Sequence, residues 1–191
     1  DVYKRQECIR PDVQIRYSTD GTEPSPQSEL YTTPLKLTSP QTVKAATFAG
    51  NRQMGKTLTL PVEWNKATAK PVTGDNAEGL NLLVNGVRGS RKHTDYEWCS
   101  WTESDSITFT VDLQKKEDIR RVTLGCITVY GMAVHKPACI RIALSDNNRT
   151  FKEAGEKRYS PEEIFREGTY IEPCIFDLEG TQAVSYTHLT L

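Results

Sequence analysis

Residues 107–113 read ITFTVDL, and this short run decides the fold class. Every second residue is apolar, beginning with Ile107 and ending with Leu113, and the residues between them are polar. A period of two is typical of a β-strand that turns one face to the core and the other to solvent. The run therefore predicts sheet structure in which another layer covers the apolar face.

The same alternation recurs along most of the chain, while helix signals are scarce. The other alternating runs are 13–17, 43–47, 122–126, 140–144 and 174–178. The clearest helix start is Ser160, because Pro161 suits the first helical position and Glu163 can bond back to the Ser160 amide. This helix should end near Gly168 after one or two turns. Many short strands between turn residues predict an all-β chain of the sandwich type.

Composition excludes several classes of protein. The 191 residues are 37% hydrophobic and 26% charged, which is enough for a packed core, and no run approaches the ~20 apolar residues of a membrane helix. A net charge of −1 offers no overall basic surface for nucleic acid. The cysteines are odd in number and lack a Cys-x-x-Cys pair, which argues against a disulfide scaffold or a zinc site. They are Cys8, Cys99, Cys126, Cys139 and Cys174.

One metal alternative involves Cys126, His135 and Cys139, which could gather round an ion. In an alternating apolar context, however, a cysteine is more often a small buried hydrophobe, and we favour that interpretation.

The polar stretch 65–79 divides the chain into two modules. We place the first at residues 8–64 and the second at residues 67–183. Residues 1–6 (DVYKRQ) and 184–191 (VSYTHLTL) resemble translated adapter sequence found at the ends of genes from assembled metagenomes. We therefore expect both ends to be non-native.

The first module carries an informative turn. Residues 15–31 read IRYSTDGTEPSPQSELY, in which an Asp20-Gly21 turn and a Glu23-Pro24 pair stand between two tyrosines. This run resembles the small fibronectin-like domain that follows the catalytic barrel of chitobiases and β-hexosaminidases. The resemblance implies a spacer or packing module without chemistry. Asp20 and Glu23 could form a carboxylate pair for acid and base catalysis, but a polar turn lacks the apolar pocket that raises a pKa.

The second module contains five ordered motifs. They are LLVNGVRG at 82–89, YEWCSW at 96–101, ITFTVDL at 107–113, IRRVTL at 119–124 and SDNNRTF at 145–151. Together they resemble the discoidin or coagulation-factor type C domain, whose bacterial versions are grouped with family 32 carbohydrate-binding modules. The resemblance implies a discoidin-like jelly roll, here lacking its last strand, which should begin after Ala183.

The same resemblance implies a structural calcium near the first motif. Asn85 stands where the family has an aspartate, so one negative charge is lost and calcium affinity should fall. No cofactor is predicted outright: a structural calcium at Asn85 is the one candidate, and the lost charge argues against it.

Sugar recognition by such modules needs an aromatic face beside hydrogen-bonding side chains. The richest combination lies in residues 91–101, which read RKHTDYEWCSW. Trp98 corresponds better to the family's core tryptophan. Tyr130 and His135 are a second choice, and the alternative for all of these residues is a core or solvated role. The candidate carbohydrate-binding residues are Arg91, His93, Asp95, Tyr96 and Trp101.

The order of the two modules resembles the C-terminal accessory region of family 20 β-N-acetylhexosaminidases of gut Bacteroidetes, with α-L-fucosidases as the alternative parent. This implies a non-catalytic, periplasmic or extracellular region whose partners are its own catalytic domain and a glycan ending in galactose or N-acetylhexosamine. A purely structural or protein-contact module is the competing interpretation. Membrane binding ranks lower, because residues 91–101 mix acidic with basic residues rather than exposing apolar spikes.

Overall fold

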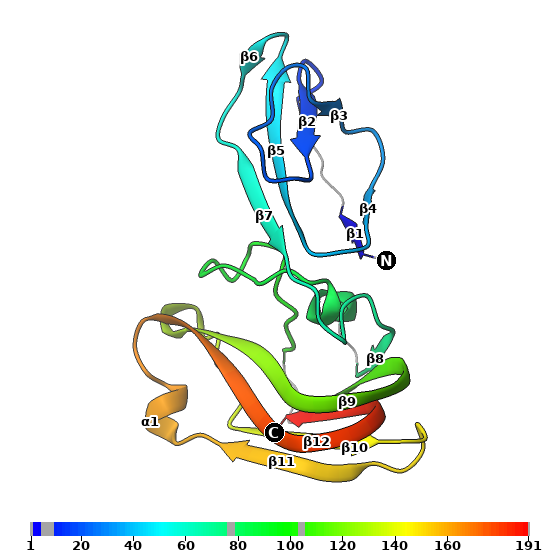
Figure 1. Cartoon of the computed structure of the whole chain (residues 1–191). Coiled ribbons are helices and arrows are strands. Elements are labelled where there is room, and N and C mark those ends of the chain that lie inside the picture. The colour runs from blue at the N-terminus through cyan, green and yellow to red at the C-terminus, as the bar shows by residue number, and fades with distance from the viewer. Residues whose placement is uncertain (1, 5–9, 76–78, 103–105, 191) are drawn as a thin grey trace. The chain divides into compact units, whose positions relative to one another are not determined.

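The computed structural model of the chain describes residues 2–4, 10–75, 79–102 and 106–190 (Figure 1). It is nearly all β, as the alternation predicts, and it divides into two compact units. The first unit comprises Asp1–Ala69 with Asn85–Val87, and the second comprises Lys70–Val84 with Arg88–Leu191. Cys8, the expected start of the first module, lies outside the described residues. The return of Asn85–Val87 to the first unit is not visible in the local sequence pattern.

The first unit is built around β5 (Gln41–Ala49), which pairs antiparallel with β2 (Gln14–Ser18) and β7 (Leu58–Val62). Its alternating residues are buried, and Val43 meets Leu37 and Val62 in a small core. Val87 packs against the same core. The shorter strands of this unit are β1 (Val2–Lys4), β3 (Glu29–Leu30), β4 (Leu35–Leu37) and β6 (Arg52–Gln53).

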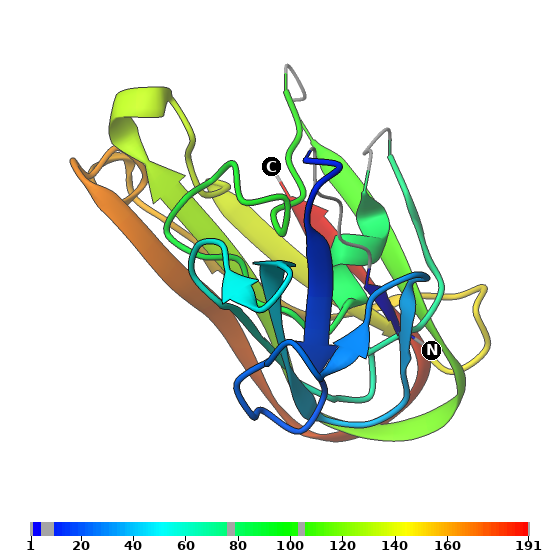
Figure 2. The ribbon, with the colours of Figure 1, turned by 90° about the horizontal axis from the view of Figure 1, so that it is seen from above.

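The second unit holds a five-stranded antiparallel sheet in the order β11-β10-β12-β9-β8. Its strands are β8 (Val72–Gly74), β9 (Ile107–Val129), β10 (Cys139–Ser145), β11 (Lys152–Arg158) and β12 (Thr169–Thr190). The long strands β9 and β12 curve along one another (Figures 1 and 2). Side chains at the alternating positions, such as Val111, Leu113 and Ile140, are 1% exposed or less and form the core. The predicted strand runs of this module are thus confirmed.

Register shifts explain how two such long strands curve. The β9–β12 pairing slips between Asp177 and Thr181 and again between Ala183 and Ser185, and Gln114 in β9 has a positive φ of 68°. Irregularities of this kind bend a strand and increase its local twist.

Helical structure is confined to short turns. The 3₁₀ turns are η1 (Leu80–Val84) and η2 (Tyr130–Met132), and α1 (Pro161–Ile164) is the one α-helix of the described residues. The predicted cap is present: the Ser160 hydroxyl accepts from the Glu163 amide, and the Glu163 carboxylate accepts from the Ser160 amide. The helix ends at Ile164, earlier than the expected end near Gly168, with Phe165 as its C-cap.

The expected gap at the last strand is not present, which corrects the prediction of a jelly roll lacking that strand. Ser185–Thr190 belong to β12 and pair with β10 on one side and β9 on the other. The alternation continues through this end, because Ala183 and Ser185 are at most 1% exposed. A segment with this period can fill a place between two strands, whatever its origin.

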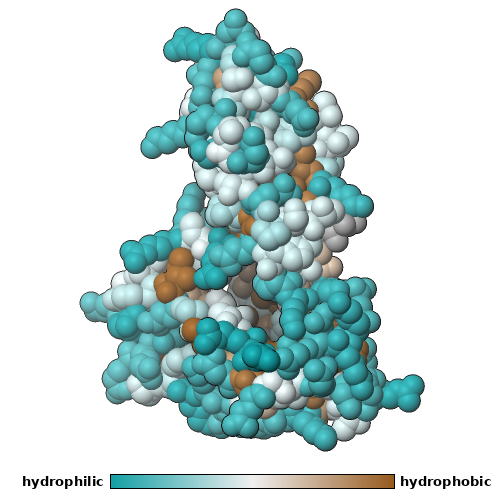
Figure 3. All heavy atoms as spheres, viewed as in Figure 1, coloured by the Kyte–Doolittle hydropathy of each residue, from teal (hydrophilic) through white to brown (hydrophobic). Residues whose placement is uncertain are grey.

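The surface is mainly polar. Figure 3 shows hydrophilic residues over most of the viewed face, with apolar residues in small separate groups. None of the helices in the described ranges has the length and hydropathy needed to cross a bilayer.

Candidate functional site

Five of the predicted sugar-contact residues lie in one irregular segment of the second unit, and Asp95 organises its centre. The Asp95 carboxylate accepts the Ser90 amide at 2.5 Å and the Glu97 amide at 3.0 Å, and the Asp95 amide donates to the Lys92 carbonyl at 3.0 Å. Partial burial favours the neutral acid, but these hydrogen bonds outweigh it and hold the pKa of Asp95 below its ordinary value. Asp95 therefore braces the loop from within.

Two further features fix residues 90–98, which we call the braced loop. The Trp98 indole N–H donates to the Ser90 carbonyl at 2.8 Å, which ties the two ends together. A Cβ at Gly89 would lie 2.2 Å from the Trp98 ring, so the tryptophan packs directly on the glycine backbone. Trp98 is thus a structural residue, as its match to the family's core tryptophan implies.

The braced loop turns its remaining candidate side chains outward. Tyr96 has a φ of 65° and is 91% exposed, the highest exposure among the large apolar residues of the described chain. Arg91 is exposed and His93 is half-buried. A positive φ is uncommon for a bulky residue and persists only where the surroundings enforce it. The braced loop thus carries an open aromatic ring, an exposed guanidinium and a half-buried imidazole.

Trp101 lies in a different environment. Its ring stacks on the buried Phe109 at a centroid distance of 6.1 Å and an interplanar angle of 13°. Its indole N–H donates to the Asp75 carbonyl at 3.1 Å. One face of this ring therefore serves the core, and sugar contact by Trp101 remains a prediction.

The second-choice residues meet in a separate aromatic cluster. The His135 ring lies 6.2 Å from Tyr130 and 5.0 Å from Phe165, both edge-on. Tyr130 and Phe165 are 44% and 55% exposed, and Met132 on the same η2 turn is 61% exposed. Phe165 was missed by the sequence analysis, although an apolar residue just after a one-turn polar helix is a usable signal.

Charged side chains support this cluster. The Lys136 side chain is only 7% exposed, and its Nζ donates to Glu172 Oε2 at 2.8 Å and lies 4.2 Å from the Tyr159 ring centroid. Glu172 also accepts from Arg166 at 2.7 Å. The Lys136 bond and then the Arg166 bond hold the pKa of Glu172 below its ordinary value. The network ties the segment carrying His135 to β12.

Two oxygens of the first motif, on Asn85 and Gly86, already accept hydrogen bonds. Asn85 is buried, and its Oδ1 accepts the Val87 amide at 2.8 Å. The Gly86 carbonyl accepts the Glu63 amide at 2.7 Å, within the first unit. Among the described residues, no group of three or more His, Cys, Asp or Glu side chains has the geometry of a metal site. Calcium at the first motif and the alternative site of Cys126, His135 and Cys139 both stay predictions.

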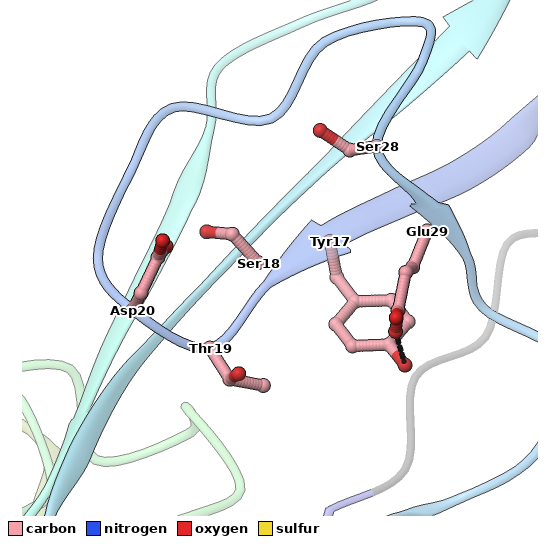
Figure 4. Close-up of a pocket in the computed structure, with 6 residues that line it drawn as sticks. All are labelled: Tyr17, Ser18, Thr19, Asp20, Ser28 and Glu29. Atoms are coloured by element: carbon pink, nitrogen blue, oxygen red, sulfur yellow. Dashed lines mark hydrogen bonds between the residues drawn. The ribbon is translucent and has the colours of Figure 1, made fainter.

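The first unit contains a shallow recess of about 260 Å³ near the Asp20-Gly21 turn. Figure 4 shows the Tyr17 hydroxyl bonded to Glu29, at 2.5 Å, and this bond raises the pKa of Tyr17 to about 12. The recess is lined by Tyr17, Ser18, Thr19, Asp20, Ser28 and Glu29.

Asp20 and Glu23, the candidate carboxylate pair, both accept hydrogen bonds from neighbouring residues. The Thr22 hydroxyl and amide donate to Asp20, and Lys44 donates to Glu23. These bonds lower the pKa of both carboxyl groups, whereas a general acid at neutral pH needs a raised one. Both carboxylates thus take part in the hydrogen bonding of this region, and their lack of a catalytic role stays a prediction.

The fold and these loops define a two-unit, all-β chain whose candidate binding groups lie on loops of the second unit. Residues 5–59 match the family model of the chitobiase/β-hexosaminidase C-terminal domain. The first module is thus similar to this domain, in agreement with the resemblance carried by its Asp-Gly turn. No curated protein matches the chain in sequence.

Solved structures of sugar-binding modules are similar to the chain only at a distance. A fucose-binding module of Streptococcus pneumoniae is 13% identical with a TM-score of 0.47, covering 66% of this chain and 86% of its own. A chitosan-binding module from a Paenibacillus sp. IK-5 chitosanase/glucanase is 14% identical with a TM-score of 0.45, covering 67% and 86%. The C-terminal domain of a Bacteroides fragilis chitobiase is 8% identical with a TM-score of 0.40, covering 62% and 80%. At these scores the likeness supports no statement about function.

Proposed function

We propose that this chain is a non-catalytic, carbohydrate-binding accessory region of a secreted bacterial glycoside hydrolase. The observation that carries the proposal is the match of residues 5–59 to the chitobiase/β-hexosaminidase C-terminal domain. That domain is named for chitobiases and β-hexosaminidases, so the parent enzyme that we propose is a β-N-acetylhexosaminidase. Such an enzyme meets its glycans in the periplasm or outside the cell.

The braced loop supplies the contact chemistry. The open Tyr96 ring can stack on the apolar face of a pyranose, and Arg91 and His93 can hydrogen-bond its hydroxyls. Because Asp95 and Trp98 hold the loop in place, little conformational freedom is lost on binding. The ligand we propose is a glycan ending in galactose or an N-acetylhexosamine.

Binding is expected to be weak and is measured by NMR titration of the whole chain with galactose, N-acetylglucosamine and N-acetylgalactosamine. An open site with one stacking ring should give a Kd of about 0.1–1 mM. Tyr96→Ala should remove most of this affinity without unfolding, since the ring is exposed. Tyr130→Ala is the matched control, because it removes an exposed tyrosine from the other aromatic cluster.

The outcomes separate the two surfaces. Loss of binding in Tyr130→Ala with none in Tyr96→Ala would move the site to the Tyr130, His135 and Phe165 cluster. No binding of any of the three sugars at 20-fold the expected Kd would contradict carbohydrate binding. The parent is tested by reading the gene on both sides of this segment: an α-L-fucosidase domain there would contradict the β-N-acetylhexosaminidase assignment.

A further inference from the structure

We propose that the braced loop selects an anionic glycan, a sugar chain carrying a sulfate or carboxylate group, over its neutral counterpart. This inference rests on the proposed carbohydrate-binding function and names the class of sugar. It begins from residues 88–93, which read RGSRKH. Three permanent cations and an imidazole stand within six residues that contain no acid.

The nearest acidic residue in the sequence, Asp95, is engaged with backbone amides rather than with Arg91 or Lys92. The Asp95 carboxylate is directed inward, to the amides of Ser90 and Glu97. Within the described ranges, no carboxylate forms an ion pair with Arg91 or Lys92. Elsewhere in this unit, several basic side chains form ion pairs, as Arg141 does with Glu156. Arg91 and Lys92 therefore keep their donors for a ligand.

The geometry of the loop brings these charges to the surface together. The Asp95 amide closes a turn on the Lys92 carbonyl, and the Lys92 amide donates to the Ser90 hydroxyl at 3.2 Å. Arg91 and Lys92 are exposed on this turn, and Tyr96 follows at 91% exposure. A guanidinium can donate two parallel hydrogen bonds to two oxygens of a sulfate or carboxylate, and the exposed Tyr96 ring of the same loop can stack on the sugar face.

The basic character is local, which makes it a selective feature rather than a property of the whole surface. The chain as a whole has a net charge of −1. A confined patch of one sign raises the local concentration of an oppositely charged ligand and adds to its affinity at low salt. Neutral galactose gains nothing from such a patch.

The test compares 6-sulfo-N-acetylglucosamine, a glucuronic-acid-terminated disaccharide and neutral N-acetylglucosamine, titrated into the whole chain at low salt. One or two exposed charge pairs of about 0.2–1 kcal/mol each correspond to a preference of roughly 1.4-fold to thirtyfold for the anionic sugars. The preference should shrink as salt is raised to 0.5 M. The sulfated and carboxylated ligands together show which anion the loop accepts.

The decisive variant is Arg91→Gln with Lys92→Gln, which should bring the anionic sugars down to the affinity of the neutral one. Both side chains are exposed, so the fold should persist, as circular dichroism would show. The control is Arg149→Gln with Lys152→Gln, which removes the same charge from exposed positions elsewhere in the unit.

Each result has a distinct meaning. Equal binding of neutral and anionic sugars would overturn this inference while leaving carbohydrate binding intact. Absence of binding by all three sugars would overturn both. A preference that survives in the loop variant but disappears in the control variant would place the anion site elsewhere, and duplex DNA bound as tightly as the sulfated sugar would remove the glycan assignment.

Discussion

Gly89 lies where the Trp98 ring leaves no room for a side chain. A Cβ there would be 2.2 Å from one ring atom and 2.4 Å from the indole nitrogen. Since the same nitrogen donates to the Ser90 carbonyl, any shift of the ring also disturbs the tie that closes the braced loop. A single methyl group therefore tests whether the loop is rigid.

Gly89→Ala should lower the free energy of unfolding by about 1–3 kcal/mol, the usual cost of overpacking a tight contact. Urea unfolding followed by tryptophan fluorescence measures it. Gly125→Ala is the control, because no atom lies within 4 Å of the added Cβ. If both variants unfold at the same urea concentration, the Trp98 contact does not constrain the loop.

Glu172 gives the second unit a pH dependence. Its bonds to Lys136 and Arg166 lower its pKa in the folded state, so it contributes stability that is present above its unfolded-state pKa of about 4. That contribution is lost as pH falls through the folded value. Unfolding midpoints measured from pH 7 down to pH 2 should therefore drop at the acid end.

Glu172→Gln should reduce the loss of stability between pH 7 and pH 2. It should also lower the free energy of unfolding at pH 7 by about 1–3 kcal/mol, because it leaves the buried Lys136 ammonium without its anion. Glu179→Gln is a matched control on the same strand, at an exposed position. An acid profile that is identical in wild type and Glu172→Gln would show that this pair does not set the pH dependence.

At the scale of elements, β12 joins parts of the sheet that are otherwise separate. Its last residues, Ser185–Thr190, pair with β10 and β9 at once. β10 has one other neighbour, β11, so the β10–β11 pair reaches the remaining strands through this segment. The end of β12 is thus central rather than peripheral.

Deleting residues 184–191 should therefore detach β10 and β11 and expose Ile140 and Ile142, which are fully buried in the intact sheet. Two unpaired strand edges should favour aggregation. Size-exclusion chromatography and binding of a hydrophobic dye measure the result, with the full chain as reference. A truncated chain that stays monomeric and unfolds as before would show that the segment does not hold the sheet together.

Local patterns predicted the strands and the helix cap well. Residues 107–113 lie in β9 and residues 140–144 lie in β10, and both strands could be predicted because alternation is a property of neighbouring residues. The Ser160 cap could be predicted because its contacts span only three positions. Contacts between residues far apart in the sequence could not be predicted in this way. The packing of Trp101 on Phe109, the place of Ser185–Thr190 between two strands and the return of Val87 to the first core all depend on pairings that no local pattern encodes.

The net charge of the chain is close to zero, but its two units carry different charged side chains near their candidate sites. The recess of the first unit is lined by Asp20 and Glu29, whereas the braced loop of the second exposes Arg91 and Lys92. In the function that we propose, the chain would hold a parent enzyme near its substrate. Linkage raises the effective concentration of glycan chains even when each contact is weak.

The chain itself should not hydrolyse nitrophenyl β-N-acetylglucosaminide or α-L-fucoside. Cleavage of either substrate requires a general acid, usually a carboxyl group that its environment keeps protonated by raising its pKa. The exposed pair of the first unit has the opposite property: Thr22 lowers the pKa of Asp20, and Lys44 lowers that of Glu23. Purified chain is incubated with each substrate from pH 4 to pH 8, and release of nitrophenol is followed by absorbance. Turnover that disappears in Asp20→Asn or Glu23→Gln would show that the turn is catalytic after all, because neither substitution removes a core side chain.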